Sequence, residues 1–308
     1  MNTQQSKLSC LFCGDRLFYR YNMSEYAIWQ CRKCGTGRVW PMPKQQKLDE
    51  FYAGFCYQAN LINKEIIITA ASELFKDFDL RATGTLSMLD VGGGGGFFAK
   101  SFENLGYGKA TYVDLDSDAC VFARDKAGVT NVFNCDAADI SNYPNSKFDF
   151  IYTRHLLEHL IDPCGFLEKM MNILKPGGIM VAHFPNSDSL EYLAYPKKLK
   201  KRVMCIQNTN KMSFIRTLWM LSSGSMLHGI DPVRHLWAIS RKGIRCWADR
   251  KHLRISIYTA HLGNKTYSPY FKSSQNFTGK FQDFIGQNIF SLIKGGTHLV
   301  AVLSNDDK

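Results

Sequence analysis

The sequence has no long hydrophobic run: nowhere do about 18 apolar residues follow one another, which argues against a membrane-spanning helix. The N-terminal residues 1–6 are polar and lack the apolar core of a signal peptide. Acidic residues are scarce, since 27 Asp and Glu stand against 38 Lys and Arg. Ten cysteines without a secretory signal favour a reducing compartment. We therefore expect a basic cytoplasmic protein without stable membrane insertion.

The most informative stretch is a short apolar run that stops in five consecutive glycines. Residues 86–91 read Leu-Ser-Met-Leu-Asp-Val and are followed by Gly92–Gly96 and then by Phe-Phe-Ala. This pattern predicts a buried parallel strand that turns sharply into a helix. Glycine takes positive φ without steric cost and lets a ligand lie against bare main chain, while the helix N-terminus offers free amides. The stretch therefore predicts a site for a nucleotide-like cofactor.

Two cofactor motifs overlap in these glycines. Gly94, Gly96 and Ala99 fit the G-x-G-x-x-A form of a dinucleotide site, but this form starts three residues beyond the strand. Gly92, Gly94 and Gly96 give G-x-G-x-G directly after a strand that carries Asp90 near its end. The second arrangement resembles motif I of the class I S-adenosylmethionine (SAM)-dependent methyltransferases.

Carboxylates end the next two expected strands. The segment 110–114 ends at Asp114, which can accept hydrogen bonds from both ribose hydroxyls of either NAD or SAM. The segment 131–135 is followed by Asp136 and Ala137. In the methyltransferases that the chain resembles, the matching acidic residue and its neighbour face the adenine.

The order of the later motifs favours SAM over NAD. Phe-Asp-Phe-Ile at 148–151, Glu-His at 158–159 with Asp-Pro at 162–163, and Leu-Lys-Pro-Gly-Gly at 174–178 follow one another. This series resembles the ubiquinone-type small-molecule methyltransferases. The resemblance implies an α/β fold with a seven-stranded, doubly wound, Rossmann-like sheet whose last strand, near 296–303, is antiparallel. It also implies that the cofactor is SAM, held by Asp90, Gly92, Gly94, Gly96, Asp114, Asp136 and Ala137.

Four cysteines form two C-x-x-C pairs near the N-terminus. Cys10 and Cys13 are separated by 17 residues from Cys31 and Cys34, and each pair is followed by a glycine. This spacing is typical of a zinc ribbon, and four thiolates leave no open position, so the expected Zn²⁺ is structural. The alternative is two redox pairs without metal.

A zinc ribbon joined to this core resembles a bacterial family of methyltransferases found with natural-product and surface-sugar pathways. The sugar C-methyltransferases of this kind carry a further C-terminal domain, whereas this chain stops at residue 308, which argues against simply assigning sugar C-methylation. We expect a zinc ribbon over 1–40, a linker and outer helix over 41–80, a SAM-binding core over 81–186, a lid insertion over 187–231, and the C-terminal part of the sheet over 232–308.

The insertion at 187–231 is the segment expected to select the substrate. It mixes aromatic residues and methionines with basic residues at 197, 198, 200, 201 and 202. In this fold an insertion after the fifth strand commonly forms a lid, and an apolar, Met-rich lid suits an apolar acceptor. The basic cluster fits a phosphate, a nucleotide-linked sugar, RNA or an anionic membrane surface, and equally a solvated lysine face.

Methyl transfer from a sulfonium depends mainly on alignment, and it needs a general base only where the acceptor must lose a proton. His155 and His235 fall at the edge of the expected sheet and are the candidate catalytic bases. The string His155-x-x-Glu158-His159 also matches inverted zinc proteases, a reading rejected because it lies inside the methyltransferase series. Some quinone O-methyltransferases that the chain resembles hold a divalent cation here, with glutamate where this chain has His155, so a second metal stays an open alternative.

Three functions follow from these patterns. The first is SAM-dependent O- or C-methylation of a small molecule, apolar or phosphate-bearing, in a secondary-metabolite, quinone-like or surface-sugar pathway. The second is an rRNA or tRNA methyltransferase, favoured by the net charge of +11 and the ribbon. Against it, residues 152–155 read Tyr-Thr-Arg-His instead of the Asn/Asp-Pro-Pro-aromatic sequence used on base amines. The third is an inactive docking protein with a methyltransferase fold.

Overall fold

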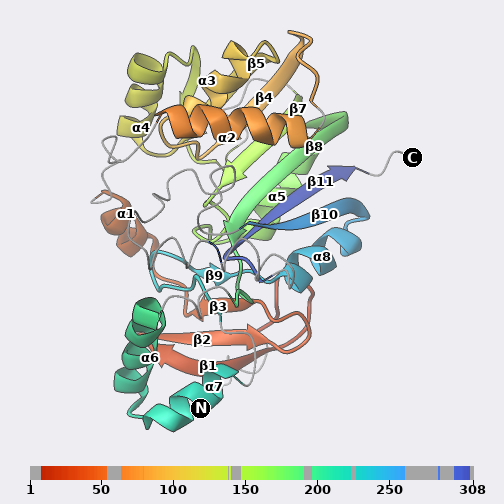
Figure 1. Cartoon of the computed structure of the whole chain (residues 1–308). Helices are drawn as coiled ribbons and strands as arrows, with labels where there is room; N and C mark the ends of the chain where they lie inside the picture. Colours follow the sequence, from red (N-terminus) through yellow and green to blue (C-terminus); the bar gives the residue numbers. More distant parts are fainter. Residues whose placement is uncertain are drawn as a thin grey trace.

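The part of the chain that the structure describes forms two sheets, one of seven strands and one of four (Figure 1). The structure is a computed structural model that describes residues 8–53, 64–78, 80–137, 139, 147–190, 196–222, 227–260, 284 and 295–305. Among the described helices, none is long and apolar enough to cross a membrane.

The seven-stranded sheet has the order β10-β11-β8-β7-β4-β5-β6. Its strands are β4 (Leu86–Val91), β5 (Gly108–Asp114), β6 (Asn131–Asn134), β7 (Phe148–Arg154), β8 (Leu174–Pro185), β10 (Leu253–Ala260) and β11 (His298–Asn305). The strands from β4 to β8 pair in parallel, whereas β11 is antiparallel to both of its neighbours. The predicted seven-stranded sheet with a reversed last strand is therefore confirmed. The strand order reverses at β4, and open α/β sheets bind ligands at such a point.

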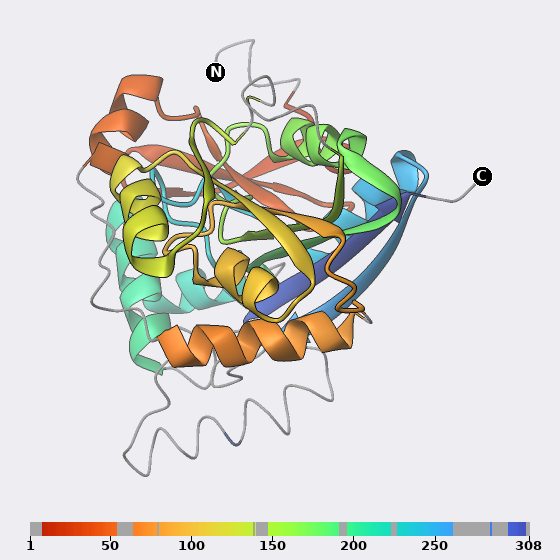
Figure 2. The same cartoon turned by 90° about the horizontal axis from the view of Figure 1, so that it is seen from above.

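Helices cover both faces of this sheet (Figure 2). Their bounds are α2 (Lys64–Asp77), α3 (Phe97–Asn104), α4 (Ser117–Phe122), the π-helical turn η3 (Ala123–Ala127), α5 (Pro163–Asn172) and α8 (Arg241–Arg250). Side chains alternate along the strands, so Leu89 packs in one buried cluster with α5 and α8, whereas Met88 packs in another with α2 and α3. Phe75 of α2 centres the second cluster, with its ring edge-on to Phe98 at 5.0 Å and to Phe150 at 5.8 Å. The fold is doubly wound, as predicted.

The second sheet contains the N-terminal cysteine segment and one strand from far along the chain. It is antiparallel, with the order β1 (Leu17–Met23), β2 (Tyr26–Cys31), β3 (Gly37–Trp40) and β9 (Trp237–Ala238). We call residues 8–40 the ribbon. Because β9 pairs with β3, the ribbon sheet is completed by the C-terminal part of the chain.

The helices of the insertion, α6 (Pro196–Asn210) and α7 (Phe214–Ser222), pack on the ribbon sheet. Arg202 of α6 donates hydrogen bonds to the Tyr21 hydroxyl at 2.9 Å and to the Leu227 carbonyl at 2.7 Å. Arg20 of β1 donates to the Met220 carbonyl of α7 at 2.6 Å. In Figure 1 these two helices lie beside β1, at the end of the molecule opposite α2. The lid function of residues 187–231 stays a prediction.

The remaining described helix, α1 (Gln45–Ala53), follows the ribbon. The outer helix expected before the first core strand is present as α2, which ends close to the start of β4. The sequence also predicts a last helix over 281–293, and of this range the structure describes only residue 284.

Candidate functional site

The glycine run after β4 has the left-handed backbone that its spacing predicts. Gly92, Gly94 and Gly96 have φ of 66°, 59° and 71°. A Cβ atom on Gly96 would lie 2.6 Å from the Cβ of Ala123, so the loop also packs too tightly there for any side chain. Gly96 is the N-cap of α3, and the loop therefore places bare main chain directly before a helix N-terminus.

Asp90 lies beneath this loop and is almost fully buried, with 1% of its surface exposed. Its Oδ2 accepts a hydrogen bond from the Ala99 amide at 3.2 Å, and a Cβ on Gly93 would lie 2.4 Å from the same oxygen. Within the described residues, Oδ1 has no hydrogen-bond partner. Burial raises the pKa of Asp90 to about 7, and the nearby carboxylate of Asp114 adds to the rise.

Asp114, at the end of β5, reaches across to the loop. Its Oδ2 accepts from the Gly94 amide at 3.3 Å, and its Oδ1 accepts from the Asp116 amide at 3.0 Å. The hydroxyl of Tyr112 lies 2.5 Å from the Gly94 carbonyl and 3.1 Å from Oδ2 of Asp114. Burial raises the pKa of the Asp114 carboxyl. The structure thus brings together Gly94 and Asp114, two of the residues predicted to hold the cofactor.

Tyr112 is a residue of this site that the sequence analysis missed. It precedes the strand-end carboxylate by two positions, and residues two apart on a strand share a face. The alternation of side chains along the strand could therefore have predicted that Tyr112 lies on the same face as Asp114. The other two predicted cofactor residues, Asp136 and Ala137, follow β6, where Asp136 is exposed and Ala137 is buried. The Cys135 amide donates to the Asp114 carbonyl at 3.1 Å, which holds this loop at the same edge of the sheet.

His155 and Glu158 form a pair at the end of β7. Nδ1 of His155 donates to Oε1 of Glu158 at 2.8 Å; the histidine side chain is 35% exposed and the glutamate only 1%. Burial, the largest single effect, would raise the pKa of Glu158, but the hydrogen bond from His155 and the charges of His155, His159 and His235 together lower it to about 2. An ionised carboxylate on Nδ1 fixes the tautomer of His155 and leaves a lone pair on Nε2. His155 has a φ of 50°, so its backbone is held in a conformation that non-glycine residues seldom adopt.

The second predicted base, His235, also lies close to Glu158. Its Nδ1 donates to the Gly229 carbonyl at 2.6 Å. Side-chain ligand atoms of Glu158, His159 and His235 all lie within 4.8 Å of one another, an arrangement that could hold a divalent cation. Burial lowers the pKa of His159 to about 4 and also lowers that of His235, so both imidazoles are neutral near pH 7.

Two further histidines lie beside His155 and were not among the predicted site residues. The rings of His183 and His298 are centred 5.8 Å and 5.0 Å from that of His155. His183 is near the end of β8, whereas His298 opens β11. Because β11 is antiparallel, its first residues lie at the edge where the parallel strands end. Burial lowers the pKa of His183 well below its usual value, so this ring is neutral.

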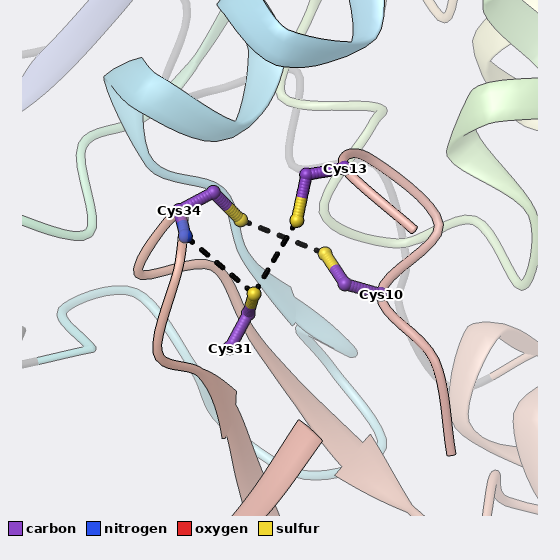
Figure 3. A group of neighbouring side chains, drawn as sticks. All are labelled: Cys10, Cys13, Cys31 and Cys34. Carbon is purple, nitrogen blue, oxygen red and sulfur yellow. Dashed lines mark hydrogen bonds between the residues drawn. The ribbon is translucent and has the colours of Figure 1, made fainter. Parts of the chain in front are cut away.

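The four ribbon cysteines converge on one point (Figure 3). Sγ of Cys10 lies 3.6 Å from Sγ of Cys34, and Sγ of Cys13 lies 3.4 Å from Sγ of Cys31. Four thiolates around tetrahedral zinc lie about 3.8 Å apart, since each Zn–S bond is about 2.3 Å long. All four cysteines are buried, and the Cys34 amide donates to Sγ of Cys31 at 3.5 Å. The donor set and its spacing fit a structural Zn²⁺.

The cysteine site and the histidine group are joined by one short segment that contains β9. The Ser240 hydroxyl donates to the Cys34 carbonyl at 2.5 Å. The Leu236 amide donates to the Glu158 carbonyl at 2.7 Å, and the Trp237 indole donates to the Leu160 carbonyl at 2.9 Å. The ribbon sheet therefore lies against the loop that follows β7, next to the predicted catalytic residues.

The sequence profile of the family described as "Methyltransferase domain" matches residues 45–261, which is more than half of the chain. A ubiquinone biosynthesis O-methyltransferase of Bradyrhizobium sp. (strain ORS 278) is 31% identical over 107 residues, which cover 33% of this chain and 41% of that protein. The chain thus spans less than half the length of this curated relative.

Solved methyltransferase structures resemble the chain at low identity and with TM-scores below 0.5. The plantazolicin methyltransferase BpumL, in complex with SAH and a substrate analogue, is 16% identical, with a TM-score of 0.49 over 84% of this chain and 94% of that chain. A SAM-dependent methyltransferase from Archaeoglobus fulgidus is 18% identical, with a TM-score of 0.47 over 85% of this chain and 99% of that chain.

Proposed function

Because the chain belongs to the family of methyltransferase domains, we propose that it is a SAM-dependent methyltransferase acting on an oxygen or carbon atom of a small-molecule acceptor. The observation that carries the proposal is the junction of β4 and β5. There the carboxylate of Asp114 accepts a hydrogen bond from Gly94, the middle one of three glycines with left-handed backbone. This junction lies beside the His155–Glu158 pair because β4 and β7 are neighbouring strands.

The residues of the junction fit the cofactor. SAM supplies an activated methyl group on a sulfonium. The bare main chain of Gly92–Gly96 and the amides at the start of α3 suit the close approach of a polar ligand. Asp114 is the residue proposed to accept the ribose hydroxyls, and Asp136 and Ala137 are proposed to line the adenine site. The buried Oδ1 of Asp90, which has no partner among the described residues, supports a role for this carboxylate in the same site.

The acceptor side is proposed to use His155 as general base. Its Nδ1 is bound to Glu158, so Nε2 carries the lone pair, and the side chain is accessible enough to meet an acceptor. A neutral imidazole can take the proton of a phenol, an enol or an acidified C–H as the methyl bond forms. Glu158 would stabilise the imidazolium that results. His235 is the second candidate base, since its Nδ1 is likewise occupied by a backbone carbonyl.

Two observations indicate the class of acceptor: the names of the relatives and the histidine base of this chain. The relatives with local similarity are named for O-methylation in ubiquinone biosynthesis, and a histidine base suits a weakly acidic hydroxyl. We propose an apolar or phosphate-bearing phenol- or enol-like acceptor in a quinone-like, secondary-metabolite or surface-sugar pathway. The ribbon zinc is proposed as structural, because four buried thiolates would complete its coordination.

Calorimetric titration of the zinc-loaded protein with SAM tests the cofactor. We expect micromolar binding of SAM and none of NAD, and binding at least about tenfold weaker in Asp114→Ala, since two ribose hydrogen bonds are lost. Asp118→Ala is the matched control, because Asp118 is exposed on α4, and it should bind as the parent does. A folded, zinc-containing protein that does not bind SAM, alone or with acceptors present, would overturn the proposal.

Transfer of labelled methyl to a panel of hydroxyquinones, catechols and enolic sugars tests the acceptor side. His155→Ala is expected to lose about 10²–10⁴-fold in kcat while keeping its SAM affinity. A variant that keeps full kcat would remove His155 from the role of base.

A further inference from the structure

We propose that α6 and α7 form a docking surface for anionic lipid membranes, on which the protein binds peripherally. The first observation is charge. Residues 192–230 contain seven Lys and Arg and no Asp or Glu. Of the seven, Lys200, Lys201, Lys211 and Arg216 are described with exposed side chains. A basic segment with no internal acidic partner attracts an anionic surface, and the attraction falls off within about 10 Å at 0.1 M salt.

The second observation is an apolar face on α7 that is turned to solvent. Ile215 and Trp219 are 79% and 70% exposed, and Phe214 and Leu218 are 54% and 39% exposed. These positions are one and four residues apart, so they form one stripe along the helix. The opposite side of α7, with Thr217, Met220 and Leu221, is buried on the ribbon. The exposed stripe is therefore not the face that holds the helix in place.

Exposed basic and apolar side chains lie together on each of the two helices. On α6, Met204 is 49% exposed and follows Lys200 by four positions and Lys201 by three, so the three side chains share a face. On α7, Arg216 stands next to Ile215 in the sequence, and Lys211 lies in the turn that joins the two helices. Large apolar side chains among lysines and arginines are the composition of interfacial helices, in which the apolar face enters the acyl boundary and the cations meet the headgroups.

The position of the surface suits this role. Figure 1 places α7 at the end of the molecule opposite α2 and α3. Side chains of α6 and α7 pack on the ribbon side that contains Tyr21 and Ile28, whereas Leu17 and Trp29 pack in the cluster that includes α5 and α8. The docking surface is thus separated from the sheet by the ribbon, and binding to a membrane leaves the glycine junction untouched.

Two other occupants fit less well. RNA bases would stack on the exposed rings of Phe214 and Trp219, but Ile215 and Leu218, the other half of the stripe, are aliphatic and offer no stacking face. A second copy of the chain, docked by two-fold symmetry, would bring the same basic segment of each copy together, so like charges would oppose the contact. An anionic lipid surface would bury the apolar stripe in the acyl boundary and attract the basic residues to its headgroups.

Co-sedimentation of the full-length, zinc-loaded protein with vesicles tests the proposal. We expect weak binding to pure phosphatidylcholine and at least about tenfold stronger partitioning when phosphatidylglycerol makes up a third of the lipid, with the gain lost at about 0.5 M salt. Ile215→Ser with Trp219→Ser should lower the partitioning about tenfold, because the inserted apolar area is removed. Lys200→Glu with Lys201→Glu should lower it as far or further.

Matched controls separate this surface from general effects of charge and hydrophobicity. Lys242→Glu with Arg245→Glu makes the same charge change on exposed residues of α8, and Val121→Ser with Tyr258→Ser removes other exposed apolar side chains. Both pairs should partition as the parent does. Equal loss in the control pairs, no preference for anionic vesicles, or a concentration-dependent dimer abolished by the α7 variants would each overturn the proposal. RNA binding with no vesicle binding would do the same.

Trp219 supplies an independent readout. It is the largely exposed tryptophan, whereas Trp29, Trp237 and Trp247 are at most 8% exposed and Trp40 is half-buried. Its emission should therefore shift to shorter wavelength when the protein meets anionic vesicles. Trp219→Phe should keep most of the partitioning and lose the shift. A shift that persists in Trp219→Phe would place the contact elsewhere and overturn the assignment of α7.

Discussion

The guanidinium carbon of Arg38 lies 4.8 Å from the ring centre of Trp237, its partner across the pairing of β3 with β9. Arg38 is 8% exposed, and burial lowers the pKa of its guanidinium. Trp237 also packs edge-on against Phe12 at 5.9 Å. The ribbon and β9, the strand that completes its sheet, therefore share one buried surface. We expect a substitution of a ribbon cysteine to disturb this surface and, with it, the position of the neighbouring segment that carries His235.

Loss of the ribbon metal is expected to destabilise the protein well beyond the N-terminal sheet. In Cys34→Ser we expect the zinc content to fall below one ion per chain and the free energy of unfolding to drop by about 2–5 kcal/mol, because a metal site and a buried contact surface are lost together. Atomic emission and denaturant unfolding measure the two effects. Cys246→Ser, a half-buried cysteine of α8, should keep its zinc. Zinc retained in Cys34→Ser would contradict the assignment of the ligands.

The Glu158 carboxylate should contribute stability that depends on pH. Its pKa is about 2 in the fold, below the ordinary value near 4.3, so the contribution is complete above about pH 5 and disappears as the pH falls towards 2. Glu158→Gln should therefore lower the free energy of unfolding by about 2–3 kcal/mol at pH 7, with a smaller loss at pH 3. Denaturant titrations across this range measure it. Glu168→Gln, which removes an exposed carboxylate paired with Lys251, should change stability little at any pH.

Asp90 should show the opposite dependence. Its pKa is about 7 in the fold and near 3.9 in the unfolded chain, so the ionised carboxylate is unfavourable and parent stability falls as the pH rises from 4 to 7. Asp90→Asn does not ionise, and its stability relative to the parent should rise by about 1–3 kcal/mol between pH 5 and pH 8. Thermal unfolding at both values checks this, with Asp118→Asn as the exposed control. A difference that stays flat with pH would show that Asp90 titrates normally.

Two glycines with the same backbone allow a test of loop packing. Gly84 and Gly96 have φ of 73° and 71°, but a Cβ would meet nothing within 4 Å at Gly84 and would lie 2.6 Å from the Cβ of Ala123 at Gly96. Gly84→Ala should cost about 1–2 kcal/mol from the left-handed backbone alone. Gly96→Ala should cost about 2–5 kcal/mol, since overpacking adds to the same strain. Equal decreases in the free energy of unfolding of the two variants would mean that the loop at Gly96 moves to accommodate the added methyl group without further cost.

The sequence by itself determined the features that depend on local spacing. Alternating glycines after an apolar run predicted the left-handed turns at Gly92, Gly94 and Gly96, because only glycine adopts that backbone without strain. Two C-x-x-C pairs predicted the convergence of four cysteines, and the order of the later motifs predicted the seven-stranded sheet with its reversed strand. Each of these signals is contained in a few neighbouring residues or in a fixed order along the chain.

Only the tertiary structure decided which distant segments meet. Nothing in the sequence marks β9 as the fourth strand of the ribbon sheet, since two residues are too few to show a period. The approach of His235 to Glu158 depends on the β9 segment docking on the loop after β7, and that of His298 to His155 depends on β11 pairing with β8. The insertion was expected as a lid, yet which face of α7 is exposed was settled by packing on the ribbon. Backbone preference acts within a few residues, whereas these contacts arise from burying apolar surface between segments far apart in the chain.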